Sequence, residues 1–98
     1  MVKINWSESA SEDLVYIYNY ICKDSAFFAS KTVKEIIQST NILKSFPNIG
    51  RIVPEISNME LRELIYKSYR IIFNIKLDGI LIRRVFHSAR LLSKEIIS

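Results

Sequence analysis

The residues that could do chemistry are concentrated in the second half of the chain. Arginine makes forked hydrogen bonds to phosphates and carboxylates, and the single histidine, His87, can exchange a proton near neutral pH. Such residues together favour a polyanionic partner, either a nucleic acid or an acidic protein; the alternative is a solvated basic surface. All of the arginines lie in this half: Arg51, Arg62, Arg70, Arg83, Arg84 and Arg90.

The distribution of charge supports this reading. Residues 1–50 contain five lysines and five acidic residues, so their net charge is zero. The second half therefore carries the whole net charge of +4. An asymmetry this complete is typical of a protein with a polyanionic partner.

Other classes of site are excluded by composition. One cysteine and one histidine allow neither an internal disulfide framework, nor a multi-thiolate metal site, nor the paired histidines of zinc hydrolases. Two distant glycines do not make a glycine-rich phosphate loop. We therefore expect no metal and no cofactor. No apolar run approaches the ~18 residues of a membrane span, and the first residues lack a signal-peptide core, so we expect a cytoplasmic protein without membrane contact.

A single domain, residues 1–98, must position these side chains, because chains of this length rarely divide. Residues 1–6 alternate apolar and polar side chains, as a short strand does. A helix follows with Ser7 or Ser9 as its N-cap, and its apolar face recurs at Ala10, Leu14, Ile17 and Ile21. A second helix begins after residues 24–25 and ends before residue 47, which predicts an antiparallel helical hairpin.

Three strands are expected in the second half. Residues 47–58 are rich in turn formers and indicate a loop, and strands are predicted at 60–66, 69–77 and 80–86. Residues 89–97 are compatible with one or two helical turns. The order βααβββ predicts an α+β domain in which the helical hairpin covers one face of a mostly antiparallel, three-stranded meander.

The dipeptide Asp78-Gly79 predicts a type I′ turn and with it a register. Leu77 would then oppose Ile80, and Arg70 would oppose His87. One face would be apolar apart from Arg84 and would pack under the helices. Its apolar residues would be Ile71, Phe73, Ile75, Leu77, Ile80, Ile82 and Phe86. The other face would be open and cationic, with Arg70, Asn74, Lys76, Arg83 and His87.

Arg70 and His87 would be cross-strand neighbours in that register. They predict a phosphate site that Arg90 would extend; the alternative is a pair of solvated sheet residues. The sequence leaves undecided which face of the sheet carries Arg62 and which carries Glu63, because the turn at residues 67–68 allows two registers. The aromatic row of the first helix indicates packing, or alternatively a seat for a partner: Tyr16, Tyr18 and Tyr20.

Four segments together resemble the RelE/ParE superfamily of type II toxins: WSESASEDLVYIYNYI (6–21), FPNIGRIVPE (46–55), RELIYKSYRIIFNI (62–75) and ILIRRVFHSARLL (80–92). The resemblance covers nearly the whole chain and implies the same fold. It also implies a partner, an acidic antitoxin from the same operon, which forms a hetero-oligomeric complex by covering the basic groove and the helical hairpin.

The resemblance implies two alternative targets. GR-VPE (50–55) and VFHSAR (85–90) are more similar to the ParE branch, whose members inhibit DNA gyrase and have no established hydrolytic activity. RelE-type members instead cleave mRNA on the ribosome without a metal. In that case Arg70 would stabilise the phosphate charge, His87 would be the acid and Glu55 the base.

Two departures count against cleavage: Ser88 replaces the tyrosine of one ribonuclease subgroup, and the dense lysine cluster of the RelE type is missing. We therefore favour a gyrase-directed toxin. A third reading is an inactive toxin that retains only antitoxin binding. In each case the residues expected to contact the target or the antitoxin are Arg51, Arg62, Arg70, Arg83, His87 and Arg90.

Overall fold

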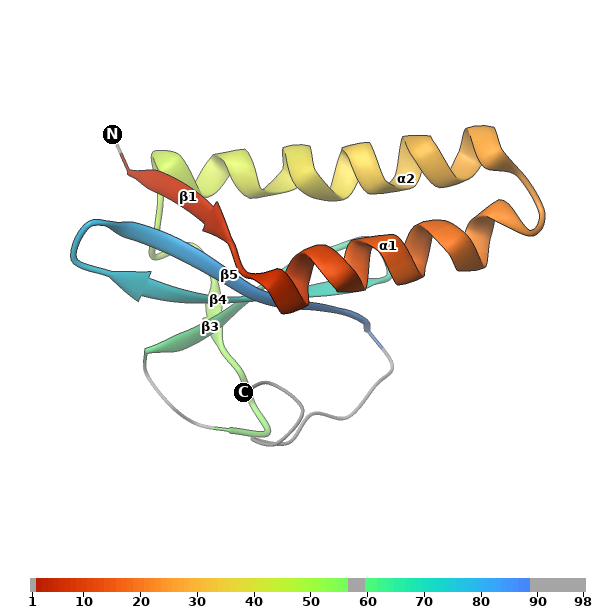
Figure 1. Ribbon diagram of the computed structural model, residues 1–98. Helices are drawn as coiled ribbons and strands as arrows, with labels where there is room; N and C mark the ends of the chain where they lie inside the picture. The colour runs from red at the N-terminus through yellow and green to blue at the C-terminus, as the bar shows by residue number, and fades with distance from the viewer. Residues whose placement is uncertain (1, 57–59, 89–98) are drawn as a thin grey trace.

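The computed structural model describes residues 2–56 and 60–88. It has an α+β fold in which a helical hairpin lies across one face of a sheet (Figure 1). The elements are β1 (Lys3–Trp6), α1 (Glu8–Cys22), α2 (Ala26–Ser39), the 3₁₀ helix η1 (Thr40–Lys44), β2 (Arg51–Ile52), β3 (Leu61–Tyr66), β4 (Tyr69–Lys76) and β5 (Gly79–His87). The predicted fold class is confirmed. No helix among these residues is long and apolar enough to span a bilayer.

The sheet has five strands in the order β1-β5-β4-β3-β2. The β3–β4–β5 meander is antiparallel as predicted, and β1 joins its edge parallel to β5. The loop predicted at 47–58 contains the short strand β2, which pairs with β3. The helical turns predicted for 89–97 lie outside the described residues.

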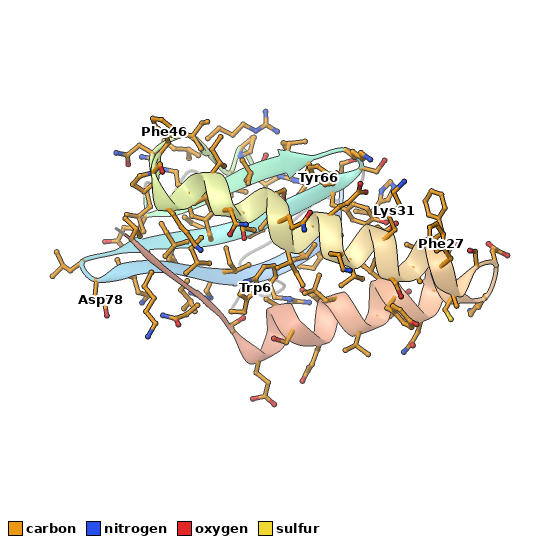
Figure 2. All side chains as sticks on the ribbon, turned by 90° about the horizontal axis from the view of Figure 1, so that it is seen from above. Trp6, Phe27, Lys31, Phe46, Tyr66 and Asp78 are labelled. Carbon is orange, nitrogen blue, oxygen red and sulfur yellow. The ribbon has the colours of Figure 1, made fainter. Side chains whose placement is uncertain are left out.

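Serine side chains begin both helices. The Ser7 side chain accepts a hydrogen bond from the Ala10 amide at 3.0 Å, and the Ser25 side chain accepts one from the Phe28 amide at 3.1 Å. Of the two caps offered by the sequence, α1 therefore uses Ser7. The predicted apolar face of α1 is confirmed, since Ala10 and Ile17 are buried against the sheet. The hairpin gives the molecule two distinct ends, with Phe27 at one and Phe46 at the other (Figure 2).

The register predicted for the β4–β5 hairpin is wrong. Leu77 and Asp78 form the turn, and Gly79 is already in β5, opposite Lys76. The reason lies in β1: a Cβ atom at Gly79 would collide with the backbone carbonyl oxygen of Lys3. Glycine is therefore required where β1 closely approaches β5, rather than in the turn itself.

A bulge near the middle of the hairpin shifts the register again. Beyond it, Arg70 pairs with Phe86 and Tyr69 pairs with His87. The predicted opposition of Arg70 and His87 is therefore wrong, because the two side chains belong to opposite faces of the sheet.

The face away from the helices is only partly open. Phe86 and Leu77, both predicted beneath the helices, lie elsewhere: Phe86 is on this second face, and Leu77 is fully exposed in the turn. Val85 takes the helix-facing position. A second small core covers part of the face predicted to be cationic, formed by Val53, Leu61, Ile72 and Phe86.

Candidate functional site

Arg70 is the centre of a buried ion-pair network on the face away from the helices. Arg70 as a whole is only 5% exposed. Its Nε and Nη2 donate to Glu63 Oε2 at 2.9 and 2.6 Å, and its Nη1 and Nη2 donate to the two Glu55 carboxylate oxygens at 2.7 and 2.8 Å. The other Glu63 oxygen accepts from Arg51 Nε at 2.6 Å. Two arginines and two glutamates thus neutralise one another.

This network ties the segment after β2 to the centre of the sheet. Glu63 lies on β3, Arg70 on β4, and Glu55 follows β2. The hydrogen bonds to Glu55 raise the pKa of Arg70, and burial opposes this effect only in part. An incoming phosphate would therefore have to displace carboxylates that already occupy this guanidinium. This geometry indicates a structural role, in which Arg70 holds the segment after β2 against β3 and β4.

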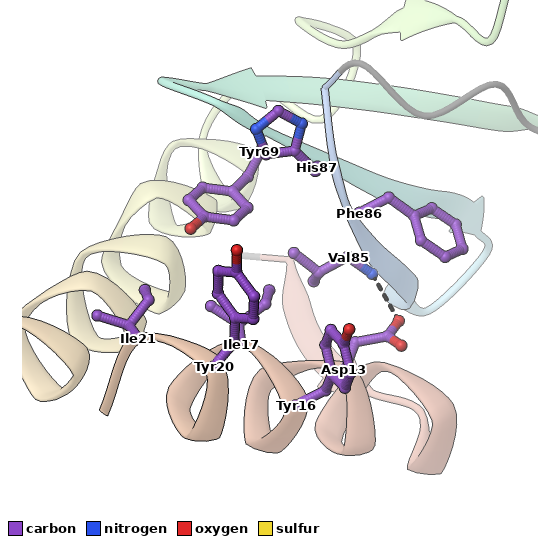
Figure 3. Close-up of a pocket in the computed structure, with 9 residues that line it drawn as sticks. All are labelled: Asp13, Tyr16, Ile17, Tyr20, Ile21, Tyr69, Val85, Phe86 and His87. Atoms are coloured by element: carbon purple, nitrogen blue, oxygen red, sulfur yellow. Dashed lines mark hydrogen bonds between the residues drawn. The ribbon is translucent and has the colours of Figure 1, made fainter. Parts of the chain in front are cut away.

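His87 lies on the helix-facing side, at the end of β5. Its ring meets that of Tyr69 edge-on, with centroids 6.2 Å apart. Both side chains line a groove of about 430 Å³ between α1 and the ends of β4 and β5 (Figure 3). Tyr16 and Tyr20 of α1 form its opposite wall and are largely exposed. Burial raises the pKa of Tyr69.

Asp13 holds α1 to the edge of β5 beside this groove. Its Oδ2 accepts from the Val85 amide at 2.9 Å and from Arg84 Nε at 2.8 Å, and its Oδ1 accepts from Arg84 Nη2 at 3.0 Å. These bonds raise the pKa of Arg84, against the effect of burial. The position predicted for Arg84, on the apolar face under the helices, is wrong: the bulge places Arg84 opposite Ile72 and over the ring of Phe86, on the face away from the helices. Sequence reasoning missed Asp13, since nothing local signals a partner 71 positions away.

The remaining predicted residues are scattered. Arg62 Nη1 donates to the Gly50 carbonyl at 3.2 Å, and Arg83 Nη1 donates to Asn74 Oδ1 at 2.8 Å. Two residues form the turn between β3 and β4, which places Glu63 on the face of Arg70 and Arg62 on the helix-facing side. Arg90 lies outside the described residues. Within the described residues, no group of three or more His, Cys, Asp or Glu side chains could hold a metal ion.

Comparison with known proteins decides the family. The family model described as the ParE toxin of the type II toxin-antitoxin system parDE matches residues 4–92. The chain belongs to the ParE toxin family. Among solved structures, this ParE-like toxin resembles a chain of the chromosomal ParDE system from P. aeruginosa, with 26% identity and a TM-score of 0.75 over 89% of this chain and 96% of that chain. No curated protein sequence matches it.

Proposed function

We propose that this ParE-like type II toxin arrests growth by binding DNA gyrase, and that an antitoxin neutralises it. We take gyrase as the target because members of the ParE branch inhibit it. The observation that favours binding over RNA cleavage is the state of Arg70, which is engaged by Glu55 and Glu63 on one face of the sheet. His87 belongs to the other face.

A ribonuclease built from these residues would need all three groups around one phosphate. General acid and base groups must come within about 2.6–3.2 Å of the protons they move. Here the sheet separates His87 from Glu55, and Glu55 is itself an acceptor for Arg70. This arrangement supports a toxin that acts through its surfaces.

Two assays on purified toxin test the proposal. The toxin is expected to inhibit supercoiling by gyrase, and the cognate antitoxin is expected to restore it. In a cell-free translation reaction programmed with a defined mRNA, no new 5′ ends are expected. Cuts inside codons that depend on translation, and that disappear in a His87→Ala variant, would establish the ribonuclease function instead.

We further propose that the groove beside α1 receives the antitoxin. Tyr16, Tyr20 and Tyr69 offer aromatic walls next to the edge of β5, and exposed aromatic side chains in a hollow are typical of protein interfaces. The antitoxin is expected to be the acidic product of an adjacent reading frame.

Calorimetry with that antitoxin tests the assignment. Tyr20→Ser is expected to weaken binding by at least about tenfold, because truncation of a central aromatic contact typically costs more than 1 kcal/mol. Val15→Ser is the matched control, since Val15 is exposed on the same helix but does not line the groove. Equal affinities for both variants would exclude this groove as the antitoxin site.

A further inference from the structure

The end of the molecule opposite the tip of the helical hairpin has an unusual apolar surface. Leu77 is fully exposed in the β4–β5 turn, and Phe46 and Ile49 are 62% and 51% exposed. Leu77 lines a hollow of about 260 Å³ together with Val2 and Pro47. Pro47 also lines the adjoining hollow with Phe46 and Ile49, so the apolar side chains are continuous. Figure 2 shows Phe46 and Asp78 at this end.

Cationic side chains surround these apolar residues. Lys3, Gly79 and Lys76 form one row across β1, β5 and β4. Residues in such a row share a face, so the two lysines flank Gly79, with Cα atoms about 10 Å apart, twice the spacing of strands. Gly79 itself is buried under the backbone of Lys3, so the exposed groups on that face are the two lysine side chains.

The charge of this end is positive. Its acidic residues are Asp78 and Glu60, and the latter lines the neighbouring hollow with Lys76 and Arg83. The described part of the chain supplies no ion-pair partner within 4.0 Å for any of the four cations of this end: Lys3, Lys44, Lys76 and Arg83. By contrast, Arg51, Arg70 and Arg84 are paired with carboxylates.

We infer that this hairpin-end surface, formed by Leu77, Phe46 and Ile49 with Lys3, Lys76 and Arg83, is the docking site for the protein that the toxin inhibits. The inference rests on the proposed function, in which the toxin acts by binding. The partner it fits is an acidic protein surface that places carboxylates against Lys3 and Lys76 and apolar side chains on Leu77.

The chemistry disfavours other occupants. A nucleic acid would use the cations, but its phosphates gain nothing from a fully exposed leucine. A second copy of the chain would bring like charges together, which is unfavourable. Cations that have no carboxylate partner in the described part of the chain, next to protruding apolar side chains, therefore fit an acidic protein.

The test compares growth arrest with antitoxin binding for variants at both ends of the molecule. Leu77→Ser and Lys76→Glu are expected to raise the toxin level needed for growth arrest by at least about tenfold, since burial of one leucine side chain contributes that much to binding. The affinity of both variants for the antitoxin is expected to change less than about twofold. Phe27→Ser and Lys31→Glu are matched controls, exposed on α2 near the other end, and should arrest growth like the wild type.

Each contrary result has a distinct meaning. Undiminished growth arrest by both variants would overturn the inference, and so would a wild-type chain that does not arrest growth. Loss of antitoxin affinity with unchanged arrest would assign the surface to the antitoxin. Salt-sensitive binding to duplex DNA, lost in Lys76→Glu but not in Leu77→Ser, would assign it to nucleic acid. If the wild type arrests growth without inhibiting gyrase, the proposed target fails, while the growth assay still tests the surface.

Discussion

Replacement of Arg70 by methionine should destabilise the fold rather than remove a reacting group. Glu63, whose side chain is 0% exposed, would lose two hydrogen bonds and keep only Arg51 as its cationic partner. Removal of one partner from a buried ion pair costs about 3–5 kcal/mol. A domain of this size has a total stability of about 5–15 kcal/mol, so the loss is a large fraction of the whole.

Urea and thermal unfolding of Arg70→Met measure this loss. Since each kcal/mol corresponds to about 4–8 °C in a domain of this size, Tm is expected to fall by at least about 12 °C. Arg51→Met is the matched control. Arg51 contacts the same glutamate, but its side chain is 61% exposed, and Glu63 would keep both hydrogen bonds from Arg70, so a smaller loss is expected.

A double variant distinguishes the cost of an unpaired buried charge from the cost of the lost Arg70 side-chain packing. Arg70→Met combined with Glu63→Met removes the buried charges together, and Glu55 and Arg51 retain access to water. It is expected to be more stable than Arg70→Met alone. An Arg70→Met protein that unfolds within about 1 kcal/mol of the wild type, yet no longer arrests growth, would refute this reasoning and return Arg70 to a functional role.

Three further predictions concern other parts of the fold. Asp13→Ala should lower the free energy of unfolding by about 1–3 kcal/mol, because it removes the carboxylate that accepts hydrogen bonds from the Val85 amide and from Arg84. Asp13→Asn should recover part of this loss in urea denaturation, and equal losses would contradict the prediction. Gly79→Ala should cost more than about 1 kcal/mol through the collision with the carbonyl of Lys3, whereas the exposed Asp78→Ala should cost less in the same assay. Burial raises the pKa of Tyr69 above its usual 10.0, so Tyr69 ionises at a lower pH in the unfolded chain than in the folded one. The contribution of neutral Tyr69 to the free energy of unfolding is therefore complete below pH 10 and is lost as the pH rises through the raised pKa. Tyr69→Phe should therefore flatten the decline of stability above pH 10, and parallel curves would disprove it.

The elements and their order follow from local patterns in the chain. Ser7 and Ser25 cap helices whose apolar faces recur every three or four residues, and turn formers separate the strands of the meander. These signals act over a few residues, so they are visible without the tertiary structure. The pattern of segments also suffices to indicate the ParE branch, which the family match confirms.

The composition of the site depended on long-range contacts. The role of Gly79 is set by Lys3 on a strand that joins the sheet from the other end of the chain. That contact moves the turn by one residue, which leaves the faces of both strands as predicted. The bulge then adds one residue to β5 and exchanges its faces beyond that point. The bulge is why Arg70 and His87 were predicted together and are found apart.

The sequence alone therefore determined the fold class, the capped helical hairpin, the meander and the concentration of arginines in the second half. Only the tertiary structure decided which of those arginines remain available to a partner. Arg70 and Arg84 meet carboxylates from distant segments, Glu55 and Asp13, while Arg83 and Lys76 have no ion-pair partner among the described residues. The physical reason is that a charge's availability depends on what packs against it, and packing brings together residues that no local pattern connects.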